Sequence, residues 1–204
     1  MRNQKERLKE KCLLFLYVLS FFTKEVNKNT FKRYLYLYYF SSSFFKDKVD
    51  NIFIEINKGN IEIQNLNIIL SDFSSDGYVK IDDNKIIIEN KLNELVEKLL
   101  NGLNGEKGSF YELYSEIKPF VNLLNSYTEE FIFTIFFSEP TFREANERNI
   151  EKIKISDSKL VKLLNRFKKK LDNKKIDNYD ILTYWMDFIL KNYYEVEEKN
   201  SELR

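Results

Sequence analysis

Two apolar runs near the start of the chain constrain its fold most strongly. The first run, CLLFLYVLSFF, covers residues 12–22, and the second, FKRYLYLYYF, covers residues 31–40. A positively charged leader, MRNQKERLKEK, precedes them, which is the order found in secretory signals and membrane anchors. The two runs therefore either direct the chain to a membrane or form two helices of a buried core.

The first run favours a core helix over a membrane address. As a helix, residues 12–22 span about 16 Å, whereas a membrane span needs about 20 apolar residues. Residues 23–27 offer no small-x-small cleavage site, and the leader carries Glu6 and Glu10. We therefore expect a core helix over residues 12–22, and a cytoplasmic protein with no membrane attachment. The single cysteine of the chain is typical of a reducing compartment.

The second run predicts another helix over residues 31–40, capped by Asn29 or Thr30 and followed by a serine segment at residues 41–43. Six of its ten residues are aromatic, which fits a packed core and would also fit a platform on which nucleobases stack. A helix distributes these rings around its whole circumference, so core packing is the favoured interpretation.

A β-hairpin is the clearest strand signal. Two β-branched runs, at residues 76–81 and 85–89, flank a polar turn of three residues, Asp82-Asp83-Asn84. An amphipathic helix is expected directly afterwards, over residues 90–100. Residues 51–56 predict a strand or a short helix, and the pattern of residues 61–73 does not separate the two.

The second half of the chain predicts further helices. Residues 101–108 hold three of the five glycines, so we expect a boundary there, between a winged-helix-like domain at residues 1–105 and a helical domain at residues 106–204. Ser109 with Glu112 resembles a capping box, and Ser156 or Asp157 is the expected cap of a later helix. The predicted fold class is mainly α with a small β-hairpin. The helices are expected at residues 109–126, 129–137, 141–148, 157–171 and 179–194.

The residue types that are missing bear on function. The chain has no histidine and one cysteine, which removes the usual general base, the Ser-His and Cys-His pairs and every His/Cys zinc site. It also lacks the glycine-rich phosphate loops and the catalytic serine and HExxH motifs. We therefore expect a protein that is not an enzyme and binds no metal and no cofactor.

Charge is distributed unevenly along the chain. Residues 1–48 hold 11 Lys/Arg against 4 Asp/Glu, residues 49–106 hold 5 against 11, and the remainder is balanced. Two groups of cations are candidate nucleic-acid contacts: Lys28, Lys32 and Arg33 near a helix start, and Lys168, Lys169 and Lys170 near a helix end. A solvated surface, and cations at a helix C-terminus, explain the same charges without any ligand.

The order of the predicted elements resembles a known family. The segments LLFLYVLSFF, NTFKRYLYLYYF, DGYVKIDDNKIIIEN and KLNELVEKLL together resemble the middle component of bacterial ABC-three-component systems. The resemblance covers residues 10–105 in pattern and the rest in length and composition. Accessory subunits of this kind belong to Lamassu-type anti-phage defence operons, beside an SMC- or Rad50-like ATPase and an effector.

The resemblance implies a non-catalytic accessory subunit that docks on the ATPase, bridges it to the effector and regulates that effector. It carries no catalytic residues over to this chain. Any contact with DNA would be made through the complex. The abundant aromatic residues agree with this role, because aromatic side chains anchor protein interfaces.

Two other functions remain open from the sequence. A winged-helix DNA-binding protein, such as a regulator or replication factor, would use the hairpin as its wing and the basic first third of the chain. Asp76, Asp82, Asp83 and Glu89 would repel phosphates from that wing. A membrane-attached or secreted protein rests on the first apolar run alone.

Overall fold

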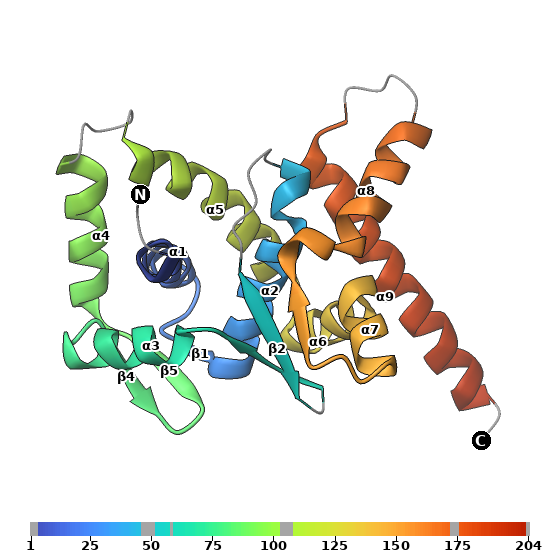
Figure 1. Ribbon diagram of the computed structural model, residues 1–204, viewed down its shortest axis with the longest axis horizontal. Coiled ribbons are helices and arrows are strands. Elements are labelled where there is room, and N and C mark those ends of the chain that lie inside the picture. Colours follow the sequence, from blue (N-terminus) through green and yellow to red (C-terminus); the bar gives the residue numbers. More distant parts are fainter. Residues whose placement is uncertain (1–3, 46–51, 58, 103–107, 172–175, 203–204) are drawn as a thin grey trace. The chain divides into compact units, whose positions relative to one another are not determined.

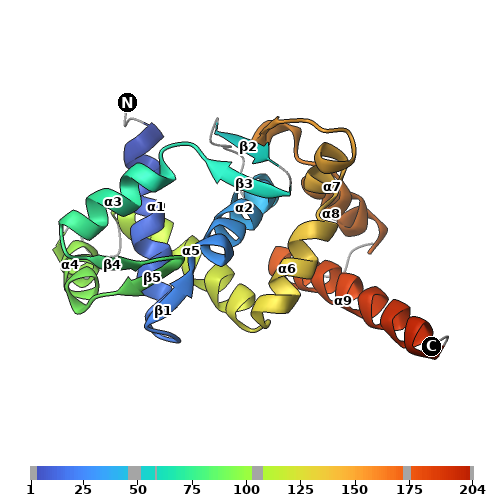
Figure 2. The same ribbon diagram turned by 90° about the horizontal axis from the view of Figure 1, so that it is seen from below.

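The computed structural model describes residues 4–45, 52–57, 59–102, 108–171 and 176–202, with side chains described as far as Glu195 (Figures 1 and 2). This part of the chain is mostly helical and contains small antiparallel sheets, which confirms the predicted mainly α class with a β-hairpin. The chain forms two compact units. Unit 1 comprises Met1–Tyr34 and Glu62–Ser126, and unit 2 comprises Leu35–Ile61 and Tyr127–Arg204.

The chain passes from one unit to the other three times, inside helix α2 (Lys28–Phe45), inside strand β3 (Asn60–Ile63) and between Ser126 and Tyr127. The boundary predicted between residues 105 and 106 lies outside the described residues, and the division into two consecutive domains stays a prediction. The elements of the first half are α1 (Gln4–Leu19), β1 (Glu25–Asn27), α2 (Lys28–Phe45), β2 (Phe53–Asn57), β3 (Asn60–Ile63), α3 (Leu66–Ser75), β4 (Val79–Asp82), β5 (Lys85–Ile88) and α4 (Asn90–Gly102). Those of the second half are α5 (Ser109–Asn125), α6 (Glu129–Ser138), α7 (Pro140–Glu147), β6 (Lys152–Lys154), the 3₁₀ turn η2 (Ile155–Asp157), α8 (Lys159–Lys170) and α9 (Asn178–Glu202).

Helix α1 is the core helix of unit 1. Every residue from 11 to 19 is buried, so this part of the helix is covered on all sides, against α4 and α5 among others. The ring of Phe15 packs edge-on against Phe31 and Phe120, with ring centroids 6.4 Å apart in both pairs. The prediction of a core helix is confirmed, but its bounds were wrong. The helix begins at Gln4 and ends at Leu19, and Phe21 and Phe22 lie beyond it, more than half exposed.

Helix α2 is longer than the sequence indicated. Asn27, rather than Asn29 or Thr30, is its cap, because the Asn27 Oδ1 accepts a hydrogen bond of 2.8 Å from the backbone N–H of Asn29. The helix also continues through residues 41–43, where Ser41 and Ser42 turn their hydroxyls back onto carbonyls of the preceding turn. Most of its aromatic rings are buried, which supports the core interpretation over an exposed stacking platform.

The predicted hairpin is present in unit 1. Strands β4 and β5 pair antiparallel around the two-residue turn Asp83-Asn84, one residue shorter than expected, and Asp83 adopts a positive φ of 49° there. The short strand β1, which the sequence did not reveal, pairs antiparallel with β5. The resulting sheet has the order β1-β5-β4, as Figure 2 shows.

Helix α3 resolves the ambiguous residues 61–73. They contain both predicted types of structure, the end of strand β3 and most of α3. The helix ends in a Schellman motif, in which the N–H of Tyr78 donates to the Phe73 carbonyl and that of Gly77 to the Ser74 carbonyl. Gly77 holds a φ of 75°, and the Phe73 and Tyr78 rings make the accompanying apolar contact. This motif directs the chain from α3 into the hairpin.

Unit 2 contains helices α6 to α9, strands β2 and β6 and the first half of β3, and these strands form a second sheet of order β3-β2-β6. Of the residues 51–56 predicted as a strand or a short helix, residues 53–56 belong to strand β2, which pairs antiparallel with β6, and residue 51 lies outside the described residues. The helices lie close to their predicted positions, but two cap assignments were wrong. Gly108 precedes α5 without a side-chain cap, and Ser158, rather than Ser156 or Asp157, caps α8 through the N–H of Val161.

Candidate functional site

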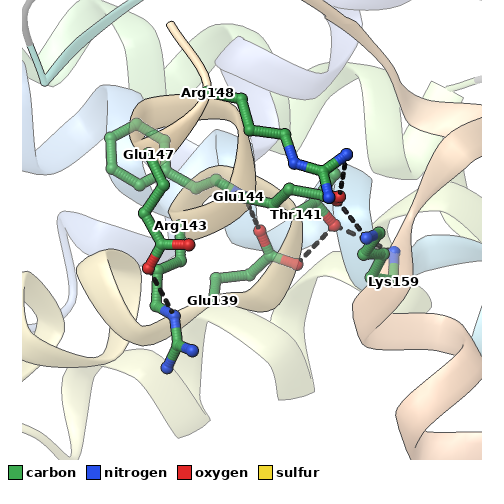
Figure 3. Close-up of polar contacts among 8 residues, drawn as sticks. Glu139, Thr141, Arg143, Glu144, Glu147, Arg148 and Lys159 are labelled. Carbon is green, nitrogen blue, oxygen red and sulfur yellow. Dashed lines mark hydrogen bonds and ion pairs between the residues drawn. The ribbon is translucent and has the colours of Figure 1, made fainter. Parts of the chain in front are cut away.

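A buried carboxylate organises the polar centre of unit 2. Glu139 is fully buried at the joint between α6 and α7 (Figure 3). Its Oε2 accepts hydrogen bonds from the Tyr36 hydroxyl at 2.5 Å and from the backbone N–H of Phe142 at 2.7 Å. Its Oε1 accepts one from the Thr141 hydroxyl at 2.7 Å. Pro140 follows at the first helical position, so Glu139 is the N-cap of α7.

The same network continues into α8. Thr141 Oγ1, which donates to Glu139, accepts a hydrogen bond of 2.9 Å from the backbone N–H of Lys159. Ser158 donates its hydroxyl to the Phe40 carbonyl of α2 at 2.6 Å. These bonds join α2, α7 and the start of α8 within unit 2.

The surroundings of Glu139 fit a structural anion better than a catalytic acid. Burial raises the pKa of the Glu139 carboxyl, while the hydrogen bonds from Tyr36, Phe142 and Thr141 lower it. Burial also raises the pKa of the Tyr36 hydroxyl well above its usual value, so this group remains a donor. All three hydrogen-bond donors stabilise the ionised form of the Glu139 carboxylate. The partial positive charge at the N-terminus of α7 stabilises the same ionised form.

Charged residues of α7 and α8 lie at the surface beside this network (Figure 3). Glu144 forms ion pairs with Lys159 and, at 3.0 Å, with Arg148, and these cations lower the pKa of its carboxyl. Arg143 pairs with Glu147 at 3.2 Å. Together they rim a groove of about 460 Å³ between α7, α8 and α9. The apolar part of the groove is formed by Pro140, Leu163, Phe167, Trp185, Phe188 and Ile189.

Two exposed aromatic side chains, Phe167 and Phe188, line this groove, and a third, Tyr184, is exposed on α9. Phe167 is 41% exposed, Tyr184 60% and Phe188 57%. Tyr184 and Phe188 are four residues apart and share one face of α9. In this part of unit 2, three large apolar rings face the solvent beside a rim of mixed charge. The aromatic-rich sequence did not reveal which of its rings these would be, because most of the others are buried.

The cations predicted near the start of α2 take part in contacts within unit 1. Lys32 forms an ion pair of 2.5 Å with Glu62, and its side chain is 13% exposed. The Lys28 ammonium donates to the Asp83 carbonyl in the hairpin turn at 2.5 Å. Arg33 is half-buried on the same helix. Their assignment as nucleic-acid contacts stays a prediction.

The lysine run at the end of α8 divides between two faces of the helix. All three lysines are exposed; Lys168 donates to the Asn178 side chain at 2.7 Å and lies over the Phe44 ring, whereas Lys169 and Lys170 form no ion pair within the described residues. Lys162 and Arg166, which the sequence reasoning missed, are also exposed on α8. Lys162 lies three residues after Lys159, and Arg166 lies four residues after Lys162. This helical spacing was the signal in the sequence that could have identified them as members of one helix face.

The remaining polar chemistry is sparse. Within the part of the chain that the structure describes, no three Cys, Asp or Glu side chains lie close enough together to hold a metal ion. Cys12 is completely buried, and burial raises the pKa of its thiol. None of the helices in the described ranges combines the length and hydropathy that crossing a bilayer requires.

Comparisons of the chain with known protein families, with curated proteins and with solved structures find no match. The resemblance to the ABC-three-component middle component therefore stays a prediction.

Proposed function

We propose that this chain is a non-catalytic accessory subunit of an SMC- or Rad50-like ATPase complex in the cytoplasm, where it bridges the ATPase to an effector in anti-phage defence. The observation that carries the binding role is the group of exposed aromatic residues Phe167, Tyr184 and Phe188, beside the charged groove of unit 2. Aromatic side chains surrounded by polar and charged groups are typical of protein interfaces. The ATPase and the effector come from the family resemblance alone.

The topology of unit 1 supports a winged-helix assignment. The order α1-β1-α2-α3-β4-β5, with a sheet of order β1-β5-β4, is the order of helices and strands in a winged helix. The segment between α2 and α3, which contains strands β2 and β3, separates the two helices that are adjacent in a simple helix-turn-helix. In this assignment α3 takes the place of the recognition helix and the β4–β5 hairpin that of the wing.

The surface of α3 favours a protein partner over DNA. This helix contains no lysine or arginine, and its one charged residue, Asp72, pairs with Lys5 of α1 at 3.2 Å. Ile68 is 52% exposed on the same helix. A helix that enters a DNA groove commonly carries lysine or arginine for phosphates and guanine edges, whereas the side-chain donors of α3 are limited to the amide of Asn67 and serine hydroxyls. A winged-helix DNA-binding protein is therefore the second candidate, supported by topology and opposed by the chemistry of α3.

Co-purification tests the proposal. The tagged chain is expressed from its own operon, and proteins retained at physiological salt are identified by mass spectrometry. An ATPase with SMC- or Rad50-like motifs is the expected partner. Phe188→Ala should lower its recovery at least tenfold, while Phe22→Ala, which removes an equally exposed phenylalanine of unit 1, should leave it unchanged. Recovery of the chain alone would overturn the proposal.

A further inference from the structure

Helix α8 of unit 2 has an unusual distribution of charge. Its twelve residues include six cations and no acid, and its last turn is Lys168, Lys169 and Lys170. With a turn of about 100° per residue, five of the cations fall within an arc of about 100°, and Lys168 falls on the opposite side. We call these five residues the α8 stripe: Lys159, Lys162, Arg166, Lys169 and Lys170.

The helix is held so that this stripe faces outward. Leu160 and Leu164 are fully buried, which fixes the apolar face of α8 against the core of unit 2. Ser158 anchors the start of the helix through the Phe40 carbonyl, and Lys168 anchors its end through Asn178. Lys162, Arg166, Lys169 and Lys170 are exposed on the remaining face.

Only one end of the stripe is neutralised by the charges described nearby. Glu144 pairs with Lys159 and lies close enough to Lys162 for that cation to lower its pKa. Within the described residues, Arg166, Lys169 and Lys170 form no ion pair. The stripe is about 17 Å long, at 1.5 Å per residue, and keeps one sign of charge over its whole length.

We propose that the α8 stripe binds the phosphate backbone of a nucleic-acid duplex without reading its sequence. Four exposed cations on a straight helix match a row of phosphates, and residues 162–170 span about 12 Å, which covers about three to four base-pair steps at 3.4 Å each. The stripe holds no aromatic residue and no amide except Asn165 at its border, so it offers little for base readout.

Two other anionic partners fit the stripe less well. A basic helix binds a lipid surface by inserting its apolar face, but the apolar face of α8 is buried in the protein. An acidic protein partner would have to bind a surface that is rich in lysine. Such a surface is untypical of a protein interface, because the centres of protein interfaces are depleted in lysine. The exposed ring of Phe167 lines the groove, and so does Lys159 at the start of the stripe, but Lys162, Arg166, Lys169 and Lys170 do not. These four cations, which carry the proposal, therefore lie outside the groove proposed for docking of an ATPase.

Fluorescence anisotropy of the full-length chain with a labelled duplex of about 20 base pairs tests the stripe. With four phosphate contacts, the slope of log K against log salt should be about −3.6, so affinity should fall about 150-fold between 50 and 200 mM salt. The variant K162Q/R166Q/K169Q leaves one contact. Its affinity should fall only about 3- to 4-fold over the same range, and at 50 mM should be at least about tenfold weaker than that of the wild type.

A charge-matched variant is the control. K80Q/K98Q/K191Q removes three exposed lysines outside α8 and gives the same net charge, and it should keep the wild-type affinity and slope. DNA and RNA duplexes are compared in parallel, since they share the phosphate backbone, and binding of either supports the proposal. Equal loss of binding in both triple variants would overturn it. The proposal would also be overturned if the wild-type chain bound polyglutamate, or anionic phosphatidylserine vesicles, as tightly as it binds either duplex. Because partner recovery depends on Phe188 and duplex binding on the stripe, failure of one proposal leaves the other standing.

Discussion

Removing the hydroxyl of Tyr36 should destabilise unit 2 by about 1.5–3 kcal/mol at neutral pH, the usual range for a hydrogen bond to a charged group. Tyr36→Phe keeps the ring, which stacks on Phe40 at a centroid distance of 4.3 Å and meets Phe136 edge-on at 5.1 Å. The variant therefore changes one thing, the 2.5 Å hydrogen bond to the buried Glu139 carboxylate. Glu139 is fully buried, so water cannot replace the lost donor without entering the core.

The loss should depend on pH, and its direction follows from the pKa of Glu139. Burial raises this pKa above the ordinary value of 4.5, so the folded protein holds the proton more tightly than the unfolded chain does. The stability connected with Glu139 is therefore fully present below that ordinary value and is lost as pH rises through the raised, folded-state value. The Tyr36 hydrogen bond lowers the folded-state pKa of Glu139. Removing this bond should raise that pKa further, so the free energy of unfolding should continue to fall up to a higher pH. The difference between variant and wild type should be smallest in acid and grow toward neutrality.

Urea unfolding followed by tryptophan fluorescence is the appropriate measurement. Trp185 is the only tryptophan and is buried in unit 2, so its emission reports on the unit that contains Tyr36 and Glu139. Tyr184→Phe, at an exposed tyrosine of the same unit, should leave the free energy of unfolding within about 0.5 kcal/mol of the wild type. A loss below about 0.5 kcal/mol in Tyr36→Phe, or a loss that stays constant with pH, would contradict the role given to Glu139.

Three further predictions concern unit 1. Asn27→Ala should cost about 1 kcal/mol in circular-dichroism unfolding, because α2 loses its N-cap, and an unchanged midpoint would refute the cap. Gly77→Ala should cost about 1–2 kcal/mol in the same measurement through its positive φ alone, since the added Cβ would meet only the Lys91 side chain at ordinary contact distance. Cys12 should react with a thiol reagent only on unfolding, and rapid labelling of the native protein at pH 8 would contradict its burial.

Local signals in the sequence were sufficient for the regular elements. The hairpin and α4 were predicted correctly because strand propensity, turn residues and helical periodicity all occur within about 25 consecutive residues. The core role of α1 followed from its length and apolar character. The ends of these elements were less predictable, because a single side chain decides them. Asn27 and Ser158 cap their helices, although neighbouring residues of the same chemical type were equally plausible from the sequence.

Elements that depend on distant partners could not be predicted. Strands β1 and β6 are three residues each and exist because they pair with β5 and β2, about 60 and 100 residues away in the chain. Glu139 before Pro140 is a recognisable helix start, but its buried partner Tyr36 is 103 residues distant. The chain also passes from one unit to the other inside α2 and β3. These passages depend on contacts between distant residues, so the composition of the sequence does not reveal them.

The α8 stripe illustrates why a run of charges in a sequence identifies a surface only partly. Lys168, Lys169 and Lys170 are consecutive, and a helix places consecutive residues about 100° apart, so three neighbours cannot share one face. The buried Leu160 and Leu164 fix the rotation of the helix, and this rotation gives Lys168 a structural contact and leaves Lys169 on the open side. Lys168→Gln should therefore lower stability without changing duplex affinity, whereas Lys169→Gln should weaken duplex binding severalfold without changing stability. Identical effects of the two substitutions would show that the rotation of α8, and with it the proposed stripe, is wrong.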